Sequence, residues 1–219
     1  FGAGGTSNCN RTIELAKKIK YDYHIEPVVH LTCLHYDKAE IDKFAKILIE
    51  EGIQNILALR GDKNPTIQEK EVFKHASDLI TYLKPKHDFC FLGACYPECH
   101  PESENKINEM KYLKKKVIAG AEILLSQLFF DNEQFFSFVE ECRIADINVP
   151  IIPGIMPVIN TAQIKRMVTM CGATFPDRFQ KIILKYENNK KALFDAGMSY
   201  ALSQVIDLLA NDIDGIHLY

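Results

Sequence analysis

Short apolar runs alternate along the chain with segments whose apolar residues recur at helical spacing. The clearest helix begins near Asp37, which forms a capping pair with Glu40, and ends at Gly52. The run from Asn55 to Leu59 follows at once and is apolar on both faces, as expected of a buried strand. This alternation predicts parallel strands joined by helical crossovers, and therefore an α/β fold. The residues expected to face the core from the helix are Ile41, Phe44, Ala45 and Leu48.

The same alternation continues to the end of the chain. The predicted strands are Val28 to Cys33, Asn55 to Leu59, Phe89 to Ala94, Ile123 to Gln127, Val149 to Ile155 and one centred on Ile216. The predicted helices run from Phe73 to Leu83, from about Glu104 to Gly120, across Phe135, Phe138, Val139 and Cys142, and from Asn160 to Gly172. The helix from Glu104 is expected to turn four apolar residues inward, namely Ile107, Met110, Leu113 and Val117.

Most of the predicted strands recur about every 30 residues, which suits a (β/α)8 barrel. A doubly wound open sheet is the alternative, but its GxGxxG fingerprint is absent, and Gly2-Ala3-Gly4-Gly5 is only a weak match. Six strands and a stub cannot close an eight-stranded barrel. We therefore expect residues 1–219 to form a single (β/α)8 TIM-barrel domain that is incompletely represented at both ends. It would lack the first strand–helix unit and most of the second strand.

Composition narrows the class of protein. The chain has 219 residues, of which 47% are hydrophobic and 25% charged, with a formal net charge of -3, as expected of a soluble globular domain. No apolar run reaches the roughly 18 residues of a membrane span, and no signal peptide begins the chain. A cytoplasmic location and no membrane contact are therefore expected. The pI near 6.2 argues against binding to nucleic acid through its phosphates.

The seven cysteines form no CxxC pair and are expected to be reduced thiols. The segment from Cys95 to His100 contains thiolate and imidazole ligands of the kind that bind zinc. However, Pro97 and Pro101 bracket it, and no second ligand pair at zinc spacing follows. We expect a loop at the end of a strand, and no metal site.

Polar residues or glycines follow every predicted strand. Arg60, Gly61 and Asp62 stand where the strand ending at Leu59 emerges. Because barrel strands deliver their carboxyl-end residues to one face, such residues are expected to converge on a site. Taken alone, the segment Arg60 to Asp62 fits a surface turn with a salt bridge as well as it fits a functional site. The converging residues would be Phe1 to Gly4, His30, Arg60 to Asp62, Tyr96, His100, Gln127 and Pro153 to Pro157.

Seven motifs in the chain resemble those of the methylenetetrahydrofolate reductase family, in the family's order. They are Phe1-Gly2-Ala3-Gly4-Gly5, His30-Leu31-Thr32-Cys33, Leu59-Arg60-Gly61-Asp62, Tyr96-Pro97-Glu98 with His100-Pro101-Glu102, Gln127-Leu128-Phe129-Phe130-Asp131, Ile151-Ile152-Pro153-Gly154-Ile155-Met156-Pro157 and Gly215-Ile216-His217-Leu218-Tyr219. The resemblance extends over nearly the whole chain. It implies a (β/α)8 barrel, FAD as cofactor, NADH or NADPH as reductant and methylenetetrahydrofolate as substrate.

The resemblance also implies where FAD binds. Arg60, His100 and Lys116 can offer positive charge or hydrogen-bond donors to its pyrophosphate, and Tyr96 offers a ring face. For Lys116, which lies in a run of three lysines, a solvated helix face is the alternative, and His30 alone would suggest a core or rim histidine. The matching positions are Phe1, Ala3, His30, Arg60, Gly61, Asp62, Ala94, Tyr96, His100 and Lys116.

Two residues match catalytic positions of the family. Asp62 matches the carboxylate beside the flavin ring, where its charge would disfavour an anionic reduced flavin and stabilise a cationic iminium form of the folate. Gln127 matches the amide that holds the pterin. Gln163 matches a residue on the substrate side, although it could simply cap a helix together with Asn160. Near Met167 the family often has an aromatic residue that stacks on bound folate or nicotinamide. The methionine weakens the expectation of that stacking contact.

The family's general acid lies on its first strand, and no Glu of this chain matches that position. The first hypothesis is a homo-oligomeric reductase in which NAD(P)H reduces FAD and the reduced FAD then reduces the folate, in ping-pong order. The second is a non-catalytic or partner-dependent barrel scaffold. A third is a different barrel enzyme acting on a phosphorylated substrate. Bound flavin would favour the first hypothesis over the second.

Overall fold

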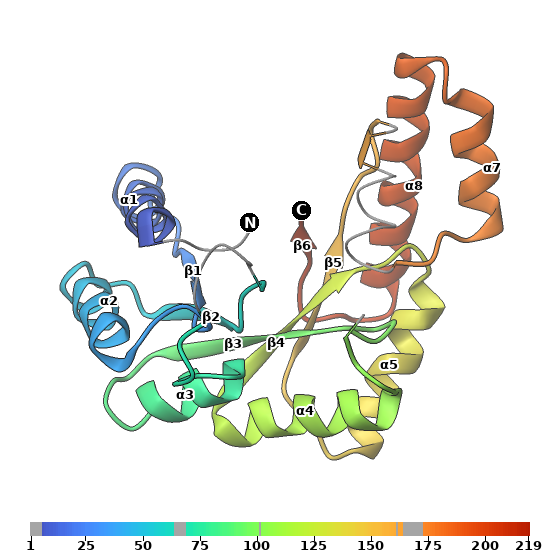
Figure 1. Cartoon of the computed structure of the whole chain (residues 1–219). Coiled ribbons are helices and arrows are strands. Elements are labelled where there is room, and N and C mark those ends of the chain that lie inside the picture. Colours follow the sequence, from blue (N-terminus) through green and yellow to red (C-terminus); the bar gives the residue numbers. More distant parts are fainter. Residues whose placement is uncertain (1–5, 64–68, 101, 161, 164–172) are drawn as a thin grey trace. The chain divides into compact units, whose positions relative to one another are not determined.

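The computed structural model describes residues 6–63, 69–100, 102–160, 162–163 and 173–219, with residues 6–10 described by backbone alone. Phe1, Ala3, Met167 and most of the helix expected over 160–172 lie outside the described residues. The chain divides into two compact units, one of Phe1–Ala94 with Lys115–Ile123 and one of Cys95–Lys114 with Leu124–Tyr219. Strands alternate with helices in both, so the predicted α/β class is confirmed (Figure 1).

The first unit begins with a helix and builds a parallel sheet. Strand β1 pairs with β2, and β2 pairs with β3, both in parallel. The elements in order are α1 (Thr6–Tyr23), β1 (Val28–Thr32), α2 (Lys38–Glu50), β2 (Asn55–Leu59), α3 (Ala76–Leu83) and β3 (Cys90–Cys95). The following α4 (Lys106–Ala119) and β4 (Ala121–Leu128) contribute residues to both units.

Helix α2 forms as its sequence predicts. The Asp37 side chain accepts a hydrogen bond from the Glu40 N–H, and the Glu40 side chain accepts one from the Asp37 N–H, so two N-terminal donors are satisfied. After the helix, Gly52 adopts a φ of +61°, a conformation that costs other residues more than glycine. The predicted inner residues Ile41, Phe44, Ala45 and Leu48 are all buried.

The two faces of the first unit's sheet have different chemistry. One face packs Val29, Leu31 and Ile56 against residues from α1, α2 and α3 in a single core. Burying one such side chain contributes about 1.5–3 kcal/mol. Side chains alternate along a strand, so the opposite face carries His30 beside Leu57, its partner in the strand register.

The second unit contains a further set of parallel strands. Strand β4 pairs with β5, and β5 pairs with β6. The other elements are α5 (Asn132–Ile144), β5 (Ile151–Ile155), α7 (Asp177–Tyr186), α8 (Lys190–Ala210) and β6 (His217–Leu218). Helices α7 and α8 run side by side (Figure 1). Aromatic residues dominate their core, where the Phe179 and Tyr200 rings stack with centroids 4.1 Å apart.

Several predicted boundaries shift by one to three residues. Helix α3 begins at Ala76 rather than Phe73, and β5 begins at Ile151 rather than Val149. The inner face of α4 is confirmed in part, because the predicted Leu113 is buried and Met110 and Val117 are half-buried, whereas Ile107 is 69% exposed. Apolar spacing missed the buried Glu109 and the inward contact of Lys116, which are polar residues on the same helix.

Candidate active site

The segment after β2 is attached to the segment after β1 by backbone hydrogen bonds. The Arg60 carbonyl accepts from the N–H groups of Cys33, at 3.2 Å, and Leu34, at 2.9 Å. The Leu34 carbonyl in turn accepts from the Lys70 N–H at 3.0 Å. Because these groups are paired with one another, the loop that carries Arg60 is held against the neighbouring strand end.

Gly61 is required by both conformation and space. Its φ is +91°, and a Cβ at this position would lie 3.1 Å from Thr32 Cβ. Any other residue would therefore be strained and crowded at the point where the chain turns toward Asp62. The Asp62 side chain is exposed, and the half-buried Arg60 donates from Nε to the Gly61 carbonyl at 3.2 Å.

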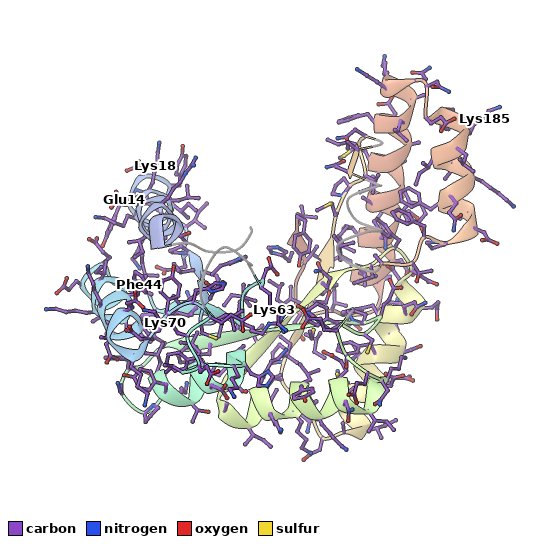
Figure 2. The ribbon with its side chains drawn as sticks, in the orientation of Figure 1. Glu14, Lys18, Phe44, Lys63, Lys70 and Lys185 are labelled. Atoms are coloured by element: carbon purple, nitrogen blue, oxygen red, sulfur yellow. The ribbon has the colours of Figure 1, made fainter. Side chains whose placement is uncertain are left out.

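Lys70 ties the same loop to the start of α2 (Figure 2). Its Nζ lies 2.8 Å from Asp37 Oδ2 and 2.6 Å from Glu40 Oε2. The hydrogen bond with Lys70 lowers the pKa of Asp37, and the bonds with Asp37 and Glu40 raise the pKa of Lys70. The three groups are well exposed, so this network orients the loop more than it stabilises the fold.

Cys33 stands beside this site but is not a nucleophile. Its side chain is fully buried, and burial, together with the Asp78 carboxylate, raises the pKa of the thiol to about 12. At neutral pH the side chain is therefore a thiol, whereas the thiolate is the reactive form. Its neighbour Arg60 lowers the pKa, but by less than burial raises it.

Lys116 reaches the carboxyl end of β3. Its Nζ donates to the Ala94 carbonyl at 2.6 Å, so this lysine does not belong to a simple solvated face. The nearby Lys114 instead donates to the Ala145 carbonyl at 2.8 Å. Within the described residues, the first unit thus contains six of the expected cofactor residues. Arg60, Gly61 and Asp62 follow β2, Ala94 lies near the carboxyl end of β3 and accepts from Lys116, and His30 lies in the middle of β1.

In the second unit, the segment after β3 places Tyr96 against His100. The two rings meet edge to face, with centroids 4.6 Å apart and planes at 84°. His100 Nδ1 accepts from the Glu102 N–H at 3.0 Å, so the neutral ring carries its proton on Nε2 and is a donor there. Cys99 is held between them at a φ of +75°. The contact of these two residues with FAD stays a prediction.

A register shift in β4 positions Gln127. The β4–β5 pairing is regular at Leu125 and resumes at Leu128, so the residues between them leave the ladder. The N–H of Gly154, the register partner of Leu128, donates to the fully buried Ser126 Oγ in this gap at 2.8 Å. Gln127 Oε1 accepts from the Leu128 N–H at 3.0 Å. The shift therefore fixes both the backbone and the side chain of the predicted pterin residue.

Gly154 and Tyr219 complete this arrangement. A Cβ on Gly154 would lie 2.5 Å from the Ser126 carbonyl oxygen and 2.6 Å from the Tyr219 ring. The Tyr219 hydroxyl donates to that same carbonyl at 3.0 Å. Only glycine allows β5 and the Tyr219 ring to approach the β4 backbone so closely.

Replacing Ser126 by alanine is expected to lower the free energy of unfolding by about 1–3 kcal/mol, because the buried Gly154 N–H loses its acceptor. Urea unfolding of the two proteins measures the change. The exposed Ser137 of α5 provides the control, since its replacement by alanine should change stability by at most about 0.5 kcal/mol. Equal effects of the two substitutions would contradict the role assigned to Ser126.

Gln163 takes part in a helix cap, as its alternative interpretation predicted. Its N–H donates to Asn160 Oδ1, and its own Oε1 accepts from the Ile159 N–H, both at 2.9 Å. The side chain thus already fixes the local backbone. Its role toward substrate stays a prediction.

Within the described residues, no group of three or more His, Cys, Asp and Glu side chains is placed to hold a metal ion. In the same part of the chain, no helix is both long and apolar enough to cross a membrane.

Some residues of the site escaped prediction from sequence. Ser126 had one available signal, a small polar residue inside the apolar run Ile123-Leu124-Leu125, but its pairing with Gly154 depends on the strand register. His35 lies beyond the predicted strand end, and nothing in the sequence indicates that its ring reaches the Asp62 carbonyl.

Comparison with known proteins places the chain in a family. A family model described as methylenetetrahydrofolate reductase matches residues 1–219. "Methylenetetrahydrofolate reductase (NADH) 1" of Arabidopsis thaliana is 35% identical over 234 residues, which cover all of this chain and 39% of that protein. "5,10-methylenetetrahydrofolate reductase" of Escherichia coli K12 is 35% identical over 210 residues, which cover 96% of this chain and 70% of that protein.

The solved structures show a shared fold. A protein from Clostridium thermocellum that binds two copies of 5-methyl-5,6,7,8-tetrahydrofolic acid superimposes with a TM-score of 0.59 at 14% identity, over 92% of this chain and 70% of that one. At this identity the likeness concerns the fold alone. The chain spans only 39% of the length of the Arabidopsis relative. The match over the whole chain and the identity to these reductases establish that the chain belongs to the methylenetetrahydrofolate reductase family.

Proposed function

We propose that the protein reduces 5,10-methylenetetrahydrofolate to 5-methyltetrahydrofolate with NADH or NADPH, through FAD in ping-pong order. The observation that carries the proposal is the match of residues 1–219 to the reductase family. The residues that follow its strands support the proposal, since they include the cationic donor Arg60 and the carboxylate Asp62. Several plant relatives carry NADH in their names, which supports NADH as the first reductant to test.

The residues of the first unit fit a dinucleotide cofactor. Arg60 follows β2 and Lys116 contacts the end of the neighbouring strand β3, so both supply cationic donors near strand ends, and Gly61 keeps the backbone next to Arg60 without a side chain. A pyrophosphate is recognised by such donors. We propose that His30, Arg60, Gly61, Asp62, Ala94 and Lys116 contact FAD, together with Tyr96 and His100. Phe1 and Ala3 belong to the same proposal. When bound, FAD takes a hydride from the nicotinamide and gives it to the folate.

We assign separate roles to Asp62 and Gln127. The Asp62 carboxylate would stabilise positive charge that develops on the folate during ring opening. The Gln127 amide would orient the pterin, whose edge offers both donors and acceptors. Gln163 is proposed as a further substrate contact. A homo-oligomer in the cytoplasm is part of the same proposal, and light scattering would test the oligomeric state.

The test is an anaerobic stopped-flow experiment on FAD-loaded protein of native length. We expect the visible flavin band to bleach when NADH or NADPH is added and to recover when methylenetetrahydrofolate follows. Bleaching without recovery would contradict the folate half of the proposal. Failure to bind FAD would favour the alternative, a barrel scaffold without catalytic activity.

A further inference from the structure

His35 links the segment after β1 directly to Asp62. It follows Cys33 and Leu34, whose N–H groups hold the Arg60 carbonyl. The His35 ring is 7% exposed, and its Nε2 lies 3.1 Å from the backbone carbonyl oxygen of Asp62. A buried ring on one loop therefore contacts the backbone of the residue to which we assign the catalytic charge.

The contact defines the protonation of the ring. A carbonyl oxygen can only accept, so Nε2 must carry the proton, and in the neutral ring Nδ1 is then an acceptor. Within the described part of the chain, Nδ1 is buried and has no hydrogen-bond partner. An imidazole here leaves one polar atom unsatisfied, which an apolar side chain of similar size would avoid. Packing alone therefore does not account for a histidine at this position.

We propose that His35 is a positioning residue, which fixes the Asp62 backbone so that the Asp62 carboxylate is held in place for the folate step. The inference rests on the role proposed for Asp62. The other attachments of the loop hold Arg60 and Lys70, which lie on either side of Asp62, whereas the His35 ring acts on Asp62 itself. Losing the ring should leave the loop attached but its exposed carboxylate less well oriented, and orientation contributes directly to rate.

Two substitutions separate this role from simple packing. His35→Leu fills the space without a donor, whereas the amide nitrogen of His35→Gln can donate from nearly the place of Nε2. In FAD-loaded protein, we expect His35→Leu to slow the reoxidation of flavin by methylenetetrahydrofolate by about tenfold or more, with its reduction by NADH unchanged within about threefold. His35→Gln should restore most of the lost rate. His87→Leu is the control, because His87 is a half-buried histidine of the same unit that packs on Phe89.

A double substitution and a spectrum complete the test. In an Asp62→Asn background, His35→Leu should cause no further loss in the folate step, because His35 acts through Asp62. Nitrogen-15 NMR of the unsubstituted protein should show a proton on Nε2 of His35 and none on Nδ1. This measurement does not depend on the activity of the protein. The Nδ1–H tautomer, or equal losses with His35→Leu and His35→Gln, would overturn the proposal. If Asp62→Asn alone has no effect, the proposed function of Asp62 fails instead, and the tautomer still reports on the contact.

Discussion

Replacing Asp62 by asparagine is expected to slow the folate-dependent reoxidation of the flavin by about 10²–10³-fold, the usual cost of removing one preorganised electrostatic group. Asparagine keeps the shape of the side chain but removes the charge that would stabilise a cationic folate. Reduction of the flavin by NADH does not pass through such a cation, and loss of a charge that disfavours the anionic reduced flavin can only favour it, so its rate should not fall. Anaerobic stopped-flow absorbance measures the two steps separately.

Asp88→Asn is the matched control for this prediction. Asp88 is an exposed carboxylate of the first unit that stands before β3, at the amino end of the strand rather than the carboxyl end. Its neutralisation should leave both half-reactions unchanged. If the two substitutions slow the folate step equally, the effect comes from net charge, and Asp62 loses its assigned role.

Replacing Gly197 by alanine is expected to destabilise the protein by about 3 kcal/mol or more, at the upper end of the cost of overpacking. Helix α8 packs with Gly197 directly on the backbone of Val158, where an added Cβ would lie 1.8 Å from the carbonyl oxygen. The helix would have to move away from this backbone, and neighbouring contacts such as that between Tyr200 and Phe179 would open. For a chain of this size, the melting temperature should fall by roughly 6–12 °C.

Ser199→Ala on the exposed side of the same helix is the control for Gly197→Ala. Within the described part of the chain, the exposed Ser199 hydroxyl bonds to the Asp195 carbonyl of the preceding turn at 2.8 Å, so alanine should be neutral or slightly stabilising. A Gly→Ala change in an unhindered helix would stabilise the protein by about 1 kcal/mol. An unchanged or raised melting temperature for Gly197→Ala would therefore show that α8 does not pack on Val158 as described.

Local rules predicted much of the fold. The start and end of α2 follow from Asp37, Glu40 and Gly52, which act within a few residues of their own position, and its inner face follows from apolar spacing. Strand β2 was predicted with its observed bounds because a short apolar run of that length in an α/β chain is typical of a buried strand. Helix α4 was predicted as a helix with Leu113 on its inner face, but Ile107 is exposed and Glu109 is buried.

The partial error at α4 and the correct placement of Arg60, Gly61 and Asp62 after a strand have related causes. In α4, Lys116 faces inward because it donates to the Ala94 carbonyl of another element, and apolar periodicity contains no information about such a partner. Arg60 to Asp62 could be located because every parallel strand has a carboxyl end and the chain marks this one with a cation, a glycine and a carboxylate.

The sequence by itself determined which residues form strands and helices, which family the motifs resemble and which polar residues follow the strands. These properties depend on neighbours in the chain, through capping, apolar spacing and the order of the motifs. The tertiary structure alone decided that Gly154 reaches Ser126 and that His35 holds Asp62, because each pair joins two segments more than 25 residues apart. Strand pairing and register bring such segments together, and a short sequence motif cannot specify a hydrogen bond whose partner lies on another strand.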